Sequence, residues 1–268
     1  MATQKVRRDP NAPERQHRDQ RQHVPRRKAI TVFVLVGVLV LGVAAIGVSM
    51  LRDDTNAGST LGAGGASPRA IPPLPNGNVE PGRYVFSTLD SDFDASHQIT
   101  IDVPDGYVGL QEGQEGWAAV KPEAHQIGVS AWVVGDVYAD PCKWSGTQLD
   151  RSAISSADGL AAALAGQEGL RVSTPTDARI DGFSGTYMER TVPVRTNLGR
   201  CDQAQFRVWL DTGGGERYLG GPGQVDLLWI LDVDGVPLVI DASLTAGATA
   251  QDRAELLQMA ESIRIDSR

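Results

Sequence analysis

The sequence predicts an α+β fold, a mostly antiparallel sheet with two flanking helices, preceded by one transmembrane helix. Short β-prone runs occupy most of the chain after residue 83, and helical periodicity appears in two places, near residues 155–166 and 249–263. Four strands, a helix, four or five strands and a last helix follow one another in that order, which is typical of the α+β class. The third observation is a 23-residue run, 29–51, without a charged side chain.

The apolar run 29–51 is long enough to cross a bilayer. As a helix it would span roughly 35 Å, against a hydrocarbon core of about 30 Å. A cleaved signal peptide usually has an apolar core of about 7–15 residues, so this longer run favours an uncleaved signal anchor. No cysteine follows the run, which excludes a lipoprotein lipid anchor. We therefore expect the lipid bilayer as a partner of residues 29–51.

The segment before the apolar run sets the expected orientation. Residues 1–28 hold nine basic and three acidic side chains. The positive-inside rule then predicts a single-pass protein of the cell membrane with a cytoplasmic N-terminus and the C-terminal domain outside. The low apolar content predicts a disordered tail. This tail would lie on anionic headgroups or, alternatively, dock with a cytoplasmic partner or nucleic acid.

The segment after the apolar run resembles a linker. Residues 52–82 hold six glycines and five prolines without any periodicity, which predicts a flexible stalk. Residues 83–268 remain for an extracytoplasmic α+β domain, enough for one core. Residues 29–268 carry 30 acidic and 16 basic side chains, so we expect no nucleic acid as a ligand of this domain.

The two cysteines, Cys142 and Cys201, are expected to form one disulfide. Both follow the apolar run, and in an oxidising compartment a single bridge is the natural state of two cysteines. No C-x-x-C pair is present, so neither zinc nor thioredoxin-type chemistry is indicated. Two free thiols are the alternative.

In the first half of the domain, apolar and polar residues alternate as in strands, and a helical periodicity follows. Strands are predicted at 84–86, 98–103, 117–120 and 127–138, and Asp140-Pro141 ends the last of these. Ser155 and Ser156 are N-cap candidates for the helix that follows. Its apolar stripe is formed by Leu160, Ala161, Leu164 and Ala165, and Gly166 and Gly169 end it.

The second half returns to strands and closes on a helix. Strands are predicted at 178–180, 186–192, 205–210, 225–233 and 236–244. Asp234-Gly235 predicts a type I′ hairpin between the last two. Thr249 is the expected N-cap of the final helix, with Asp252 in the capping-box position. Its buried side is predicted to hold Ala254, Leu257, Ala260 and Ile263.

Three segments resemble membrane-anchored actinobacterial proteins. They are Asp140-Pro141-Cys142, the run 181–187 (Asp-Gly-Phe-Ser-Gly-Thr-Tyr) and the run 229–242 that leads into the last helix. Residues 84–266, with their ending Ser262-Ile263-Arg264, also resemble the Mog1/PsbP-like α/β/α sandwich. The resemblance implies a twisted antiparallel sheet with helices on its faces and no particular activity. Because PsbP-like proteins are mostly accessory or binding subunits, it favours a protein that is not an enzyme.

Two sequence patterns are partly similar to a calcium loop and a phosphate loop, but each lacks residues that the motif requires. Asp90, Asp92 and Asp94 have the spacing of a calcium loop, but Ala95 and Ile101 occupy the positions of the required Gly and Glu. The glycine clusters 213–215 and 220–223 lack the Gly-Lys-Ser/Thr of a phosphate loop. An acidic surface loop and a mobile loop, which could act as a lid, are the simpler interpretations. We expect no metal and no cofactor.

No catalytic set stands out. His97 and His125 are the only histidines after the apolar run, and Ser130 lies in a sequence without the second glycine of a nucleophile elbow. Glu112 and Glu115 could form a glycosidase pair, but two acids in a Gly-rich turn are usually solvated. We therefore assign no catalytic residue.

The tryptophans leave a further alternative open. All five stand in or beside predicted strands, at 117, 132, 144, 209 and 229. Tryptophans at strand positions usually fill the core, whereas several on one exposed face would form a binding platform. The sequence thus predicts a membrane-anchored binding or accessory module for an envelope protein or a small molecule. An extracytoplasmic enzyme such as a hydrolase, and a signalling element using the basic tail, are the alternatives.

Overall fold

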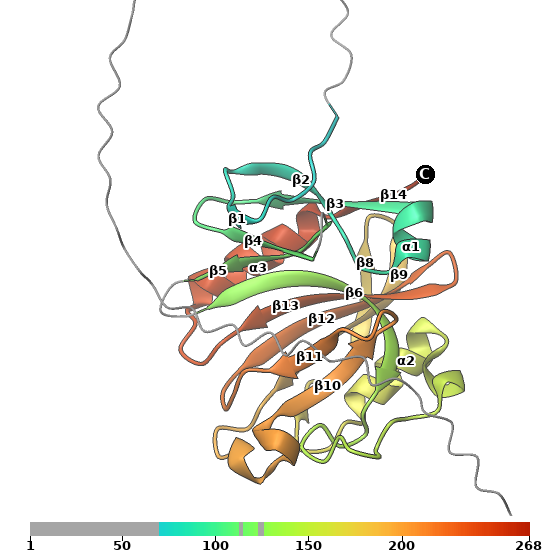
Figure 1. Cartoon of the computed structure of the whole chain (residues 1–268), viewed down its shortest axis with the longest axis vertical. Helices are drawn as coiled ribbons and strands as arrows, with labels where there is room; N and C mark the ends of the chain where they lie inside the picture. Colours follow the sequence, from blue (N-terminus) through green and yellow to red (C-terminus); the bar gives the residue numbers. More distant parts are fainter. Residues whose placement is uncertain (1–69, 113–114, 123–125) are drawn as a thin grey trace, which may run out of the picture. The chain divides into compact units, whose positions relative to one another are not determined.

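A computed structural model describes residues 70–112, 115–122 and 126–268, without the side chains of Glu112 and Glu115. It consists of an eleven-stranded sheet, a three-stranded sheet and three α-helices (Figure 1). The helices are α1 (Ser91–Ser96), α2 (Ala157–Ala165) and α3 (Ala250–Ser262). Short 3-10 turns occupy Arg151–Ile154, Leu198–Arg200 and Asp202–Ala204.

Every pair of named strands is antiparallel. Along the large sheet the order is β1 (Gly77–Asn78), β4 (Val108–Glu112), β5 (Glu115–Lys121), β6 (Ile127–Val137), β13 (Val236–Leu244), β12 (Val225–Val233), β9 (Phe183–Thr191) and β7 (Arg171–Val172). Beside this path, β8 (Thr176–Ile180) pairs with β9, β10 (Phe206–Asp211) with β6, and β11 (Glu216–Leu219) with β10. The small sheet is β14 (Arg264–Ser267), β3 (His97–Val103) and β2 (Gly82–Phe86).

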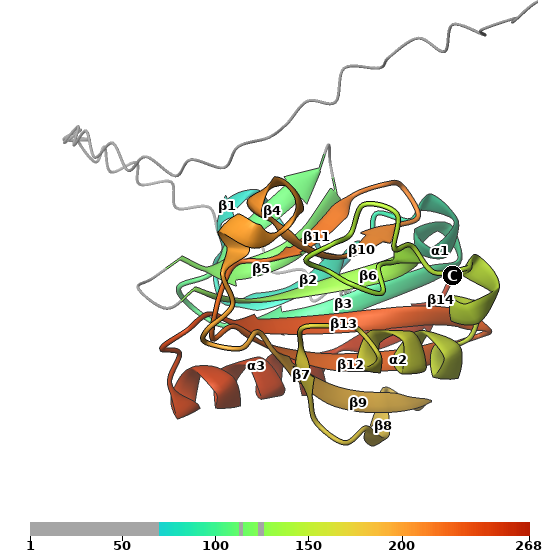
Figure 2. The ribbon, with the colours of Figure 1, turned by 90° about the horizontal axis from the view of Figure 1, so that it is seen from below.

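The centre of the large sheet is buried on both faces. Alternate residues of β12 contribute to two separate cores, so Leu227 and Leu231 pack on the α3 side and Leu228 and Ile230 on the α2 side. Figure 2 shows α2 and α3 along the sheet, with the small sheet also packed into the α3-side core. This explains why β12 and β13 are nearly continuous apolar runs. Helices on opposite faces agree with the α/β/α arrangement that the resemblance implied.

The local signals for turns and caps are confirmed. Asp234 and Gly235 have φ of 51° and 87°, as a type I′ turn requires. Ser156 caps α2 through the backbone N–H of Gly159, and Gly166 follows the helix. Thr249 and Asp252 form a reciprocal capping box at the start of α3.

The predicted buried side of α3 is wrong in part. Ala254 is exposed and Leu257 is half-buried, whereas Leu256 and Met259 are buried together with the predicted Ala260 and Ile263. The helix is rotated about its axis so that the larger side chains of Leu256 and Met259 face the sheet. That orientation removes more apolar surface from water than burying Ala254 would.

The folded part of the chain begins before Arg83. Leu74 is fully buried, and its segment pairs with β2 through Leu74 N–H to Val85 O at 2.9 Å and Val85 N–H to Pro72 O at 2.8 Å. A Cβ atom at Gly109 or Gly116 would collide with this segment, so these glycines let it cross β4 and β5 closely. Residues 72–79, assigned to the linker from sequence, are therefore part of the fold.

The predicted tail 1–28 and transmembrane helix 29–51 lie outside the described residues, as does the linker up to residue 69. Within the described part of the chain, no helix has the length and apolar character needed to cross a membrane. The short elements α1, β1, β4, β7, β11 and β14 were not predicted, because none is long enough to show a period.

The two cysteines are bonded to each other. The Cys142–Cys201 bridge joins the loop after β6 to the turn before β10. Two backbone bonds flank it, from Asp202 N–H to Cys142 O at 2.8 Å and from Arg207 N–H to Pro141 O at 2.9 Å. The bridge thus fastens the start of β10 to the main sheet.

The bridge generates a first prediction. Replacing both cysteines with serine should lower the free energy of unfolding by roughly 4 kcal/mol, because a loop of 59 residues is no longer closed in the unfolded state. Denaturant unfolding of the oxidised protein and the double variant measures this difference. Reductant should destabilise the original protein to the level of the variant and leave the variant unchanged. An equal free energy for variant and original would contradict the prediction.

Candidate functional site

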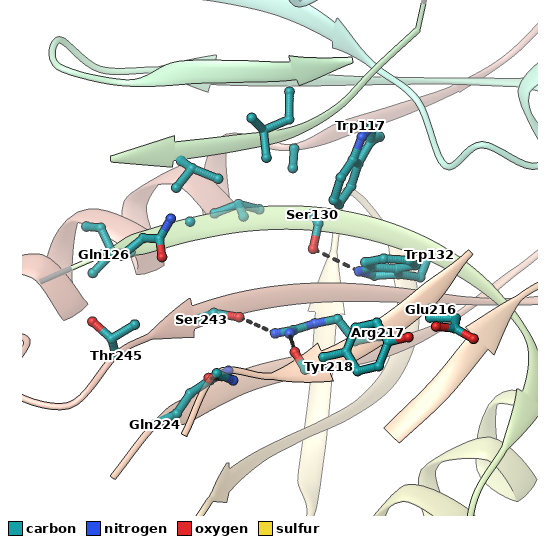
Figure 3. A pocket seen from close by; sticks show the side chains of 17 residues that line it. Trp117, Gln126, Ser130, Trp132, Glu216, Arg217, Tyr218, Gln224, Ser243 and Thr245 are labelled. Atoms are coloured by element: carbon teal, nitrogen blue, oxygen red, sulfur yellow. Dashed lines mark hydrogen bonds between the residues drawn. The ribbon is translucent and has the colours of Figure 1, made fainter. Parts of the chain in front are cut away.

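A cleft opens where the large sheet divides into two arms. The first half of β6 pairs with β5, for example Ser130 with Ala118, and its second half pairs with β10, for example Asp136 with Leu210. β4 and β5 form one arm, and the β10–β11 hairpin forms the other. Between the arms, parts of β6 and β13 line a cavity of about 320 Å³ (Figure 3).

The cleft has an apolar wall and a polar wall. The β4–β5 arm supplies Leu110, Trp117, Ala118 and Val120. Alternate residues of β6, which share one face of the strand, supply Gly128, Ser130 and Trp132. The opposite wall and one end carry the polar groups Glu216, Arg217, Tyr218, Gln224, Ser243 and Thr245. Such a concave site, apolar with a few convergent polar groups, is the usual form of a small-molecule site.

Two tryptophans meet at the apolar wall. Trp117 is half-buried, and its ring lies edge-on to buried Trp132 with centroids 5.5 Å apart. The Trp132 indole N–H donates to Ser130 Oγ at 2.8 Å, and its ring contacts Trp209 in the core behind at 5.9 Å. Trp117 is therefore a partly exposed aromatic surface held by a rigid support.

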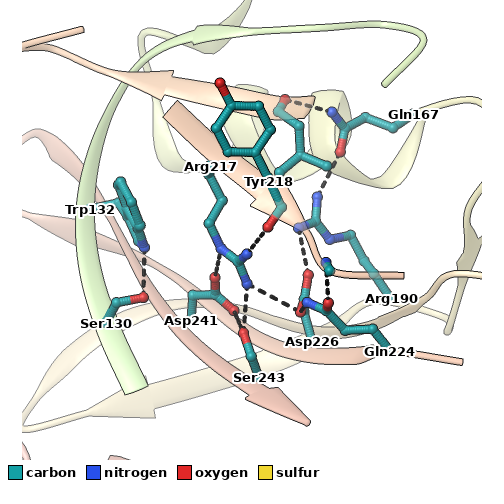
Figure 4. A network of polar contacts seen from close by, with 12 residues as sticks. Ser130, Trp132, Gln167, Arg190, Arg217, Tyr218, Gln224, Asp226, Asp241 and Ser243 are labelled. Atoms are coloured by element: carbon teal, nitrogen blue, oxygen red, sulfur yellow. Dashed lines mark hydrogen bonds and ion pairs between the residues drawn. The ribbon is translucent and has the colours of Figure 1, made fainter. Parts of the chain in front are cut away.

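The polar wall is fastened by Arg217. From β11, its guanidinium crosses to β13 and donates to Asp241 Oδ2 at 2.6 Å and to Ser243 Oγ at 2.6 Å (Figure 4). It also lies 3.4 Å from Asp226 Oδ1 on β12 and donates to the carbonyl of Tyr218. Only 14% of the Arg217 side chain is exposed, so this ion pair is largely shielded from water.

A second arginine completes the cluster behind the cleft. Arg190 on β9 donates to Asp226 Oδ2 at 3.1 Å and to Gln167 Oε1 at 2.6 Å. Gln167 in turn donates to the carbonyls of Tyr138 and Val208, both at 2.8 Å. Two positive and two negative side chains, on four different strands, thus form one buried ion cluster: Arg190, Arg217, Asp226 and Asp241.

Burial and pairing act against each other in this cluster. Burial raises the pKa of Asp241 above the usual range of a carboxyl, and the Arg217 guanidinium offsets part of that rise. Burial lowers the pKa of Arg217, but Asp241 and Asp226 raise it by more. Burial also lowers the pKa of Arg190, against the attraction of Asp226. Asp241, Arg217 and Arg190 are therefore charged groups whose burial is offset by their partners.

Arg207 and Glu216 support the same wall from outside. Arg207 Nη1 lies 2.6 Å from Glu216 Oε1, and its Nη2 donates to the Tyr218 hydroxyl at 3.0 Å. The Arg207 guanidinium also stacks 3.7 Å above the ring of Trp144, which belongs to the disulfide-bonded loop. Glu216 and Tyr218 of the cleft are thereby linked to that loop.

The candidate residues named from sequence do not come together. His97 is buried and does not line the cleft; its ring nitrogens form hydrogen bonds with Ser96 and Asp234, and its ring stacks on Phe93. Ser130 lines the cleft, where its hydroxyl accepts from Trp132. His125 lies outside the described residues. Glu112 and Glu115 are paired in register at the end of the β4–β5 arm, and their side chains are not described.

The acidic and glycine-rich segments have structural roles. Asp90 caps α1, and Asp94 accepts bonds from Ser87 and Thr88. Among the described residues, no group of His, Cys, Asp or Glu could hold a metal ion. The two glycine clusters flank β11, the wall of the cleft, so the segment predicted to be a mobile loop contains a paired strand.

The tryptophans divide between the two interpretations. Trp132, Trp209 and Trp229 are buried, as expected for core residues, whereas Trp117 and Trp144 are half-buried. Sequence reasoning missed the ion cluster. The available signal was the presence of charged side chains inside predicted strands that are otherwise mostly apolar. Asp226 and Asp241 lie in two neighbouring strands, and Arg190 lies in a third.

No protein-family model and no curated protein matches the chain. Among solved structures, LpqN, involved in cell envelope biogenesis of Mycobacterium tuberculosis, is similar at 15% identity and a TM-score of 0.36, over 69% of this chain and 90% of LpqN. CyanoP of Synechocystis sp. PCC 6803, a cyanobacterial PsbP, is 14% identical with a TM-score of 0.31, over 76% of this chain and 99% of CyanoP.

A protein from Bacteroides thetaiotaomicron is 10% identical with a TM-score of 0.31, over 71% of this chain and 49% of that protein. Because all three TM-scores are below 0.5, these likenesses carry no conclusion about the cleft.

The ion cluster generates a second prediction. Arg217→Met leaves Asp241 buried without its guanidinium and should lower the free energy of unfolding by about 3–5 kcal/mol at neutral pH. A carboxyl whose pKa is raised by folding stabilises the folded state below its unfolded pKa and loses that effect as pH rises through the folded pKa. The deficit relative to the original protein should therefore shrink as pH falls.

The matched control is Arg217→Met combined with Asp241→Asn, in which no charge is left at position 241. Urea unfolding between pH 4 and 8 should show a smaller deficit for this double variant, with little pH dependence. A single variant as stable as the original at neutral pH would contradict the prediction.

Proposed function

We propose that the chain is a membrane-anchored extracytoplasmic binding module, and that its cleft takes a small molecule with an apolar body and one polar end. The observation that carries this proposal is the division of the cleft into the apolar wall with Trp117 and the polar wall with Arg217. A volume of about 320 Å³ is within the range of small-molecule sites. A ligand would stack its body on Trp117 and direct its polar end toward Gln224, Ser243 and Thr245.

The contacts of the polar groups favour binding over catalysis. Glu216 is paired with Arg207, and Arg217 is surrounded by its acceptors. The hydroxyl of Ser130 accepts from an indole, which does not activate it as a nucleophile. Groups held in this way orient a ligand without offering a proton or an electron pair for reaction.

The proposed location rests on the amino-terminal sequence and the disulfide. The uncharged run 29–51 would span the bilayer, and the basic excess before it favours a cytoplasmic N-terminus. The Cys142–Cys201 bridge fits an oxidising compartment outside the membrane. The cleft would then face the space outside the cell membrane.

The third prediction tests the cleft. The probe is anilinonaphthalene sulfonate, which has an apolar ring system and one polar end, added to the full-length protein in a non-ionic detergent. Trp117→Ala should weaken binding of the probe about tenfold, because the partly exposed aromatic wall is lost. Fluorescence titration measures the dissociation constant. A titratable signal should also appear as energy transfer from tryptophan to the probe, and it should fall in the variant.

Val194→Ala is the matched control, since Val194 is an exposed apolar side chain that does not line the cleft. It should bind the probe like the original protein. Equal loss in both variants, or none in Trp117→Ala, would show that the probe binds elsewhere and contradict the proposed cleft.

The fourth prediction tests the orientation. Alkaline phosphatase, which folds only in an oxidising compartment, should be active when fused after Arg268 and inactive when inserted after Lys28 of the full chain, ahead of the run 29–51, in a bacterial host. Enzyme activity normalised to the amount of fusion protein is the measurement. Replacing the basic residues of 1–28 with glutamine should reduce activity of the Arg268 fusion, because the positive-inside signal is removed. Phosphatase activity of the Lys28 fusion alone would contradict the proposed orientation.

A further inference from the structure

The outer edge of the large sheet beyond β9 ends in β8. Among the described residues, β8 pairs with β9 alone, and β7 continues the same edge (Figure 2). One side of β8 is therefore without a strand neighbour from residues 70–112, 115–122 and 126–268. Unpaired edges are templates for another strand, and proteins usually place charges on them to prevent pairing.

The backbone groups of β8 that face outward can be assigned from its hairpin. β8 and β9 are joined by the two-residue turn Asp181-Gly182, with φ of 48° and 89°, so Ile180 and Phe183 are a hydrogen-bonded pair. Alternation then directs the N–H and C=O groups of Thr176, Ala178 and Ile180 toward β9. Those of Asp177 and Arg179 face outward.

The charges on this edge are complementary to a second copy of the same strand. Asp177 and Arg179 are both exposed and stand symmetrically on either side of Ala178. In an antiparallel pair centred on Ala178, Asp177 of each copy lies directly opposite Arg179 of the other. Opposite charges in directly facing positions attract, whereas a parallel pair in the same register would place like charges together.

We propose that β8 is a self-association edge, through which two copies of this chain pair antiparallel about a twofold axis at Ala178. Asp177 and Arg179 of one copy exchange four backbone hydrogen bonds with Arg179 and Asp177 of the second copy. The two Ala178 residues form the closely spaced pair without hydrogen bonds, where a small side chain fits. The eleven-stranded sheets of the two copies then continue into each other.

A groove beside β8 adds apolar contact to this interface. A cavity of about 540 Å³ on the α3 side of the sheet is lined by Ala178, Ile180, Tyr187, Trp229, Leu257 and Ala260, with charged side chains at its rim. In the antiparallel pair, Ile180 of the second copy lies opposite Thr176 at the margin of this groove. The proposed partner strand thus runs along the margin of this groove.

Cysteine crosslinking of the full-length protein in native membranes tests the proposal. Facing Cα atoms of a pair without hydrogen bonds are about 4.5 Å apart, which a disulfide can bridge. Both natural cysteines are already bonded to each other, so Ala178→Cys introduces the free thiol. We expect a disulfide-linked dimer after mild oxidation. Thr174→Cys, exposed on the same edge but away from the axis, is the matched control and should remain monomeric.

Charge reversal then tests whether the crosslinked dimer arises from the proposed strand pairing or from random encounters of two copies. In the Ala178→Cys background, Asp177→Lys or Arg179→Glu should each lower the yield of dimer about tenfold, because both facing pairs become repulsive. The two variants expressed together with tags of different size should recover the mixed dimer, in which every facing pair is again opposite in charge. The folded state of each variant is checked by urea unfolding, whose midpoint should match that of the Ala178→Cys protein.

Dimer formation by Ala178→Cys no greater than by Thr174→Cys would overturn the proposal. So would yields that charge reversal does not change, or a mixture of the two variants that fails to recover the mixed dimer.

Discussion

The ion pairs of Arg217 with the two buried aspartates, Asp226 and Asp241, hold β11 against the face of the large sheet. In the part of the chain that the structure describes, β11 pairs with β10 alone, and the guanidinium of Arg217 attaches it across the sheet face to β12 and β13. Backbone pairing with β6 positions β10, whereas the contacts of Arg217 fix how closely β11 approaches the sheet face and thereby form the polar wall of the cleft. Because replacing a buried ion pair with apolar residues often costs nothing, we infer that the cluster chiefly fixes the position of β11 and contributes little net stability.

The two faces of the large sheet are covered by different elements. On the α3 side the sheet is covered continuously by a helix and the small sheet, and apolar packing dominates. On the α2 side the cover consists of a short helix and the β10–β11 hairpin, and the disulfide holds the start of that hairpin. The face left open by this shorter cover is the cleft. The candidate site is thus a region of the sheet face that the described residues leave uncovered, between the β4–β5 arm and the β10–β11 hairpin.

Sequence predicted the elements that are long or carry strong local chemistry. The hairpin at Asp234-Gly235 and the capping box at Thr249 were predictable because each depends on two or three neighbouring residues. The burial of Leu74 and the pairing of Arg217 with Asp241 were not, since both depend on segments that meet only after folding. The cleft was missed for the same reason. Its walls come from β5, β6 and β11, and the glycines around β11 indicated a loop where the tertiary contacts form a strand.

The crossing of Leu74 over β4 and β5 has a mechanical consequence. Its side chain packs between Gly109 and Gly116, and its carbonyl accepts from the Gln111 side chain at 2.8 Å. These glycines and Gln111 belong to the same two strands that carry Leu110 and Trp117. A pull on residues 70–74 would therefore act on the strands that form the apolar wall of the cleft before it reached the rest of the sheet. The entry segment and the apolar wall of the cleft thus share two strands, so a displacement of one would act on the other.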